Sequence, residues 1–162
     1  MITDEHVQVL TQFLITGIHR SIIKGSFSIA KATADILLKI VSHFSSKRGD
    51  TTQDLIDCVK SAGDKMQEAF PQLLIIGNIV RRILYIIREE HVQKQTNQDV
   101  VDVYHERSLQ HLLGNKNTEI DLKQSIDIKK GVIESIQGLM QELDVLDDDI
   151  LVERIEQHIH TG

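Results

Sequence analysis

The polar residues best suited to chemistry follow one another closely within and just after the most apolar stretch of the chain, Leu73–Ile87. They are Asn78, Arg81, Arg82, Arg88, Glu89 and Glu90. Neighbouring carboxylates on a helix point in different directions, so Glu89 and Glu90 do not form the opposed pair that acid–base catalysis needs. Arginines and acids at the end of a helix are typical of structural ion pairs or of a partner-binding surface, and the sequence leaves both interpretations open.

The histidines offer a second candidate, because His158 and His160 are two residues apart near the C-terminus. On a helix, such residues point about 200° apart and cannot chelate one ion, although Asp147–Asp149 lie close in sequence. Histidines that interact with the dipole at a helix end are the alternative. The sequence also has no phosphate-binding loop, no GxSxG elbow and no CxxC pair, and the single Cys58 falls at an apolar helix position.

We therefore predict no catalytic, cofactor or metal site. The candidate partner-interface residues are Asn78, Arg81, Arg82, Arg88, Glu89, Glu90, His158 and His160.

The composition of the chain excludes further classes of function. The chain has 162 residues, which suits one domain, and 41% of them are hydrophobic. Aromatic residues make up only 4%, with no tryptophan, and the net charge is -6, so we expect no direct nucleic-acid binding. No secretory signal and no membrane-spanning stretch is visible, which predicts a cytoplasmic protein.

The charge is distributed unevenly along the chain. Residues 20–48 contain six basic residues and one acid, whereas residues 119–162 contain eleven acids and four basic residues. Two solvated faces of opposite sign would account for this pattern. A basic patch that meets an acidic or phosphorylated partner is the alternative interpretation.

The hydrophobic pattern predicts an all-α protein. Apolar residues recur at three and four positions throughout, and Pro71 is the only proline. We predict a bundle of six or seven helices with a long polar connection, 93–122, before the last two; this connection is a candidate for disorder. The predicted helices are 4–20, 28–44, 51–70, 72–90, a short one at 106–113, 123–144 and 148–159.

The helix predicted over 72–90 is apolar on more than one face, so we place it at the centre of the bundle. Its polar residues then need partners or a path to water. In the helix predicted over 123–144, Gly131 and Gly138 lower helix propensity. They either allow another helix to approach closely or are simply tolerated.

Five segments together resemble a known family. The most particular is GNIVRRILYIIREE at Gly77–Glu90, which resembles the signature of the beta subunits of eukaryotic translation initiation factor 2B. The resemblance is weakest at Met1–Arg20 and Gln93–Lys123. The other four segments are KGSFSIAKATADILLKIVSHF (Lys24–Phe44), TTQDLIDCVKSAGDKMQEAFP (Thr51–Pro71), KKGVIESIQGLMQELDVL (Lys129–Leu146) and ILVERIEQHIH (Ile150–His160).

The resemblance implies that residues 1–162 are a single N-terminal helical domain, with a Rossmann-like domain expected after Gly162. It implies a regulatory, non-catalytic role in the guanine-nucleotide exchange factor for initiation factor 2. The implied partners are the alpha, delta, gamma and epsilon subunits and initiation factor 2, especially its phosphorylated alpha subunit. Within the signature, we expect Asn78 and Arg82 to brace the bundle, and Arg81 and Arg88 to lie nearer an interface.

Two alternatives remain open at this stage. A helical fragment of a related sugar-phosphate isomerase would share the layout, with its catalytic residues in the second domain. An unrelated helical adaptor would share only the bundle.

Overall fold

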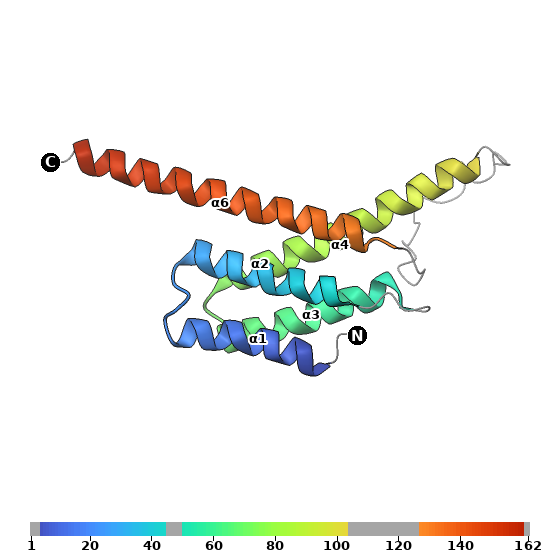
Figure 1. Ribbon diagram of the computed structural model, residues 1–162, viewed down its shortest axis with the longest axis horizontal. Coiled ribbons are helices and arrows are strands. Elements are labelled where there is room, and N and C mark those ends of the chain that lie inside the picture. Colours follow the sequence, from blue (N-terminus) through green and yellow to red (C-terminus); the bar gives the residue numbers. More distant parts are fainter. Residues whose placement is uncertain (1–3, 45–49, 104–126, 161–162) are drawn as a thin grey trace.

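A computed structural model describes residues 4–44, 50–103 and 127–160, and it confirms the all-α class. The described residues form five helices (Figure 1). These are α1 (Asp4–His19), α2 (Ser26–His43), α3 (Thr52–Ala69), α4 (Leu74–Val103) and α6 (Lys129–His160).

The first four helices pack side by side, and α6 lies across α2 and α4 and then runs on beyond the bundle (Figure 1). The core lies where α2, α3 and α4 meet, and α6 adds to it with its first turns. Its largest fully buried side chains include Leu37, Ile40, Met66, Ile83, Ile87 and Ile136.

Helix α3 begins with a complete capping box, as the polar residues before Leu55 suggest. The Thr51 hydroxyl accepts a hydrogen bond from the backbone N–H of Asp54, and the Asp54 carboxylate accepts one from the backbone N–H of Thr51. Both bonds satisfy amides that the helix itself leaves free. The hydrogen bond from the Thr51 backbone, followed by that from its hydroxyl, lowers the pKa of Asp54.

We expect the Thr51→Ala variant to lose about 1 kcal/mol of unfolding free energy, because the cap is removed.

The pKa of Asp54 is lower in the folded state, so the contribution of its carboxylate to stability is present above the unfolded pKa near 3.8. That contribution is lost as the pH falls through the folded pKa. Chemical denaturation of wild type and Asp54→Asn tests this. The stability difference should be present at about pH 6 and shrink towards about pH 3. A difference that grows on acidification would contradict it.

Helix α4 is longer than the sequence predicts. It continues through Gln93 to Val103, into the first part of the connection predicted over 93–122. Glutamine and lysine favour helix, and no glycine or proline interrupts Gln93–Val103, so the polar composition there is compatible with a helix. The short helix predicted over 106–113 lies outside the described residues.

Helix α6 is a second difference between the structure and the sequence prediction. The sequence predicts two helices, 123–144 and 148–159, whereas the structure has one helix from Lys129 to His160 that continues through Asp147–Asp149. Residues 123–126 lie outside the described residues. Lys31 of α2 donates a hydrogen bond to Asp144 at 2.9 Å and lies 3.6 Å from Asp147. The bond to Asp144 raises the pKa of Lys31. The prediction failed because three aspartates were taken as a helix start, whereas two acids of this region face a lysine on α2.

This contact also bears on the uneven charge distribution. Part of the basic segment meets part of the acidic segment inside the chain, through Lys31, Asp144 and Asp147. Lys39 pairs with Asp35 on its own helix. Lys47 and Arg48 of the basic segment lie outside the described residues.

Candidate functional site

Helix α4 has two distinct faces between Leu74 and His91. Ile76, Ile79, Val80, Ile83, Leu84 and Ile87 are buried against α2, α3 and α6. The prediction that this helix lies at the centre of the bundle therefore holds for its buried face only. The opposite side is exposed along its whole length, which explains how its charged residues reach water.

The exposed side is defined here as the α4 outer face. At 100° per residue, its members fall within a sector of about 120°. Tyr85, at its centre, is 57% exposed. The members are Asn78, Arg81, Arg82, Tyr85, Arg88 and Glu89. Arginine and tyrosine are enriched at protein–protein interfaces, where their large side chains supply much of the binding energy.

Two hydrogen-bonded or ionic contacts order this face. Arg81 donates to the Asn78 side-chain oxygen one turn earlier, so Asn78 positions an arginine on its own helix. Arg82 lies 3.8 Å from Glu142 of α6. Both of those side chains are more than half exposed, so this pair adds little stability.

Glu90 differs from its neighbour Glu89, because it turns towards α6. The hydroxyl of Ser135 donates to the Glu90 carboxylate at 2.9 Å, in a partly buried position. A Cβ atom at position 131 would overlap this carboxylate, so Gly131 leaves the space that it occupies. Gly138 has nothing within 4 Å of the same hypothetical atom. Gly131 therefore makes room for a side chain of α4, and Gly138 is simply tolerated.

The two glycines make a matched pair of alanine substitutions in one helix. We expect Gly138→Ala to raise the free energy of unfolding by about 0.5–1 kcal/mol through helix propensity alone. Gly131→Ala should give a smaller gain, because the flexible Glu90 carboxylate must move and gives up its hydrogen bond from Ser135, which offsets the gain by about 1 kcal/mol. Denaturant titrations measure both, and in a Glu90→Ala background the two glycine substitutions should have similar effects. Equal effects of the two glycine substitutions would contradict this account.

One buried polar contact was not predicted. His91 is fully buried, and its Nδ1 lies 2.7 Å from the hydroxyl of Thr52 in α3, while no partner for its Nε2 is found among the described residues. His91 follows Ile87 by four residues, so helical periodicity alone places it on the buried face of α4. That signal was available in the sequence. The contact joins the start of α3 to α4.

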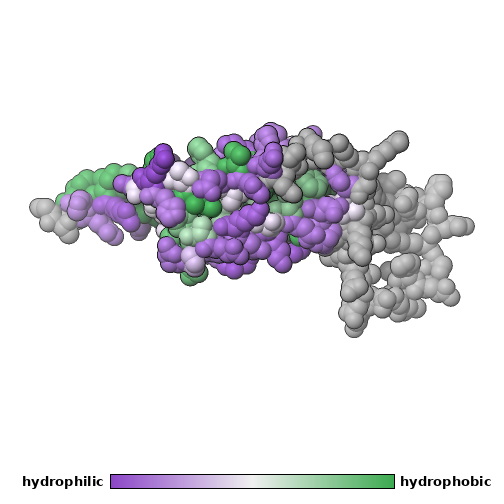
Figure 2. Space-filling model, turned by 90° about the horizontal axis from the view of Figure 1, so that it is seen from below, coloured by the Kyte–Doolittle hydropathy of each residue, from purple (hydrophilic) through white to green (hydrophobic). Residues whose placement is uncertain are grey.

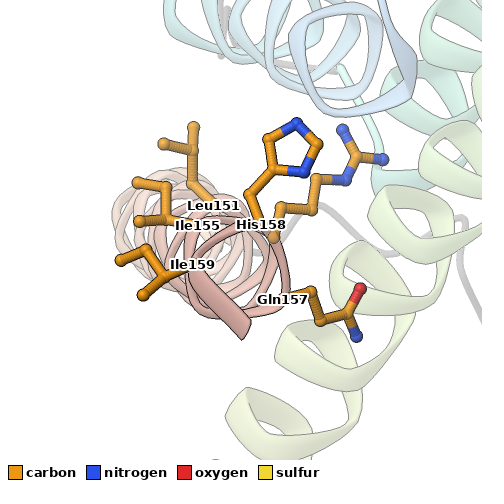
Figure 3. A pocket seen from close by; sticks show the side chains of 6 residues that line it. Leu151, Ile155, Gln157, His158 and Ile159 are labelled. Carbon is orange, nitrogen blue, oxygen red and sulfur yellow. The ribbon is translucent and has the colours of Figure 1, made fainter. Parts of the chain in front are cut away.

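The histidine candidates lie apart from the α4 outer face. His158 is exposed on the part of α6 that projects past the bundle (Figure 2 and Figure 3), and the backbone of His160 ends that helix. Within the described ranges, no group of three or more histidine, cysteine or acidic residues is arranged to hold a metal ion. Among the same residues, no helix combines the length and apolarity needed to cross a membrane.

Comparison with known proteins agrees with the resemblance in sequence. No protein-family model matches the chain. A protein of Schizosaccharomyces pombe, "Translation initiation factor eIF2B subunit beta", is 26% identical over 203 aligned positions, which cover 99% of this chain and 51% of that protein. The alignment is longer than the chain, so the relative has additional residues within the matched region.

A protein of the same name from Dictyostelium discoideum is 40% identical over 78 residues, which cover 48% of this chain and 19% of that protein. The chain spans about half the length of the first relative and less of the second. The chain is homologous, over nearly its whole length, to the beta subunit of translation initiation factor eIF2B.

Proposed function

We propose that this chain is a regulatory, non-catalytic helical domain of the eIF2B guanine-nucleotide exchange complex in the cytoplasm. Its role is to contact the alpha, delta, gamma and epsilon subunits and initiation factor 2, especially the phosphorylated alpha subunit of that factor. A Rossmann-like domain follows it in the complete subunit. The homology to eIF2B subunit beta supports a place in this complex.

The observation that carries the proposal is the division of α4 into a buried face and the α4 outer face. This helix is the segment that most closely resembles the family signature. Side chains that only hold a bundle together are expected to point inward, as Ile83 and Ile87 do. Arg81, Tyr85 and Arg88 point outward instead, where they are available to a partner.

The remaining candidate interface residues are assigned according to their positions and contacts. Glu89 belongs with the arginines of the α4 outer face, whereas Glu90 positions α6. His158 and His160 lie at the far end of α6 and would meet a different part of a partner.

The test is direct binding by the 162-residue chain. Each purified sister subunit, and initiation factor 2 with and without phosphorylation of its alpha subunit, is passed over the immobilised chain. Saturable binding to at least one sister subunit or to initiation factor 2 is expected. If the folded chain binds none of them, and a complete beta subunit still binds them under the same conditions, the proposal for this domain is wrong.

A further inference from the structure

The turn between α3 and α4 lies at the end of the bundle opposite the N-terminus (Figure 1). Within this turn, Pro71 has no N–H to donate, and the N–H of Leu73 donates to the carbonyl of Phe70 at 3.0 Å. The start of α4 is also held by little apolar packing, because Ile76 is the only buried side chain among residues 73–77. The first turn of this helix therefore depends on contacts from outside it.

The side chain of Gln67, near the end of α3, supplies such contacts. Its Nε2 lies 2.9 Å from the carbonyl oxygen of Phe70, and 3.5 and 3.4 Å from those of Pro71 and Leu73. A carbonyl only accepts hydrogen bonds, so the end of the amide that faces these oxygens is the NH₂ group. The bond to Phe70 has good geometry for a strong bond, and the two longer contacts are weaker.

Phe70 is held by Gln67 at both of its backbone groups. Its carbonyl accepts from the Gln67 side chain, and its N–H donates to the Gln67 carbonyl at 3.2 Å. The Phe70 ring is buried, and its centroid lies 4.9 Å from that of the His19 ring at the end of α1. The turn is therefore tied to α3 through Gln67 and to α1 through Phe70.

Gly77, in the first turn of α4, borders the other end of the same amide. A Cβ atom at position 77 would lie 2.6 Å from Oε1 of Gln67, which is closer than real Cβ contacts. Glycine is a poor helix former, and here its missing side chain leaves the space that the amide occupies. Gln67 thus meets the turn with its nitrogen and the start of α4 with its oxygen.

The first members of the α4 outer face follow at once. Asn78 is the next residue, and its side-chain oxygen accepts a hydrogen bond from Arg81. In an α-helix, the N–H groups of residues 78–81 donate to the carbonyls of residues 74–77. If the first turn of α4 opens, these N–H groups lose their acceptors, and Asn78 and Arg81 lose their fixed directions.

We propose that Gln67 is a positioning residue for the α4 outer face. Its amide holds the first turn of α4 against the end of α3, so that Asn78 and Arg81 keep their directions, and Gly77 leaves the space that this amide needs. The role belongs to the chain alone and goes beyond the proposed contacts with partner proteins.

Hydrogen exchange of the full chain, followed by NMR, tests the role of Gln67. A hydrogen bond of average net strength shifts a local opening equilibrium about 5-fold. Gln67→Ala should therefore speed exchange at the amides of residues 78–81 at least about 5-fold and leave those of residues 83–91 at wild-type rates. Gln67 is only partly buried, so circular dichroism should show unchanged helix content.

Two further variants separate hydrogen bonding from packing. Gln67→Glu keeps the shape of the side chain but turns an oxygen towards three carbonyl oxygens, so it should speed exchange at residues 78–81 at least as much as Gln67→Ala. The matched control is Gln53→Ala. The amide of Gln53 donates to Asp57 on its own helix, and this variant should leave residues 78–81 unchanged.

The role of Gly77 is tested by Gly77→Ala in two backgrounds. In the Gln67→Ala chain the space is empty, and alanine should slow exchange at residues 78–81 because it favours helix. In the wild-type chain the amide must move and give up its hydrogen bond. The slowing should therefore be at least about 3-fold greater in the Gln67→Ala background.

Four results would overturn the proposal. Gln67→Ala could leave residues 78–81 at wild-type rates, it could speed exchange equally along all of α4, or Gln67→Glu could behave as wild type. Equal effects of Gly77→Ala in the two backgrounds would contradict the role of Gly77. These measurements use no eIF2B subunit, so their failure and that of the proposed partner contacts are distinguishable.

Discussion

Replacing Ile83 by alanine should lower the free energy of unfolding by about 2–5 kcal/mol. Ile83 is completely buried in the first half of α4, a helix that packs on α2 and α3. Removing three carbons there forfeits burial and leaves a cavity that the packed neighbours fill only in part. Single domains are stable by only about 5–15 kcal/mol, so this one change removes a large share of the total. Denaturant unfolding followed by circular dichroism measures it.

The matched control is Tyr85→Ala, two residues further along the same helix. Tyr85 is 57% exposed on the α4 outer face, and its removal should change the free energy of unfolding by no more than about 0.5 kcal/mol. A substitution at Tyr85 that costs as much as Ile83→Ala would mean that the α4 outer face is part of the core. The assignment of that face to a partner would then fail.

The second large effect is expected on binding. In the Arg81→Glu/Arg88→Glu variant, two cations that lie on one side of α4, two turns apart, become anions. Truncating a single arginine at the centre of an interface costs about 2 kcal/mol or more, and reversing its charge adds repulsion. We expect the affinity for an eIF2B subunit or initiation factor 2 to fall at least about 30-fold. Calorimetric titration measures it.

The unfolding midpoint of this variant should stay close to that of wild type, because both arginines are exposed. Lys60→Glu/Lys65→Glu makes the same change of charge on the exposed surface of α3 and should leave the affinity within about 3-fold. If both double variants weaken binding equally, the effect comes from net charge. The α4 outer face would then have no special role.

Much of the fold could be predicted from periodicity. Apolar residues at helical spacing located α1, α2 and α3 to within a few residues. The C-terminal end of α4 and the extent of α6 could not be predicted, since solvated helix and polar loop have similar compositions. Asp144 and Asp147 face Lys31, which is more than a hundred residues away in sequence, and the local sequence does not show this contact.

The sequence identifies the candidate interface residues, but it does not show which of them are exposed and which contact the bundle. Glu89 and Glu90 are adjacent and chemically alike, yet one is exposed and the other accepts a hydrogen bond from Ser135. That difference arises from the position of α6, which local sequence does not encode. Likewise, the low overall amphipathicity of α6 conceals two apolar rows on different faces, one packed and one exposed.

Oxidative footprinting of Tyr85 and Phe13, the exposed aromatic residues in the described ranges, tests the central claim most directly. Tyr85 lies on the α4 outer face and is 57% exposed, whereas Phe13 lies on α1 and is 71% exposed. Hydroxyl radicals modify both in the free chain. In a complex with an eIF2B subunit or initiation factor 2, modification of Tyr85 should fall at least about 5-fold while that of Phe13 is unchanged, because burial at an interface excludes solvent. A stable complex in which Tyr85 is oxidised as fast as in the free chain would contradict the assignment of the α4 outer face to a partner.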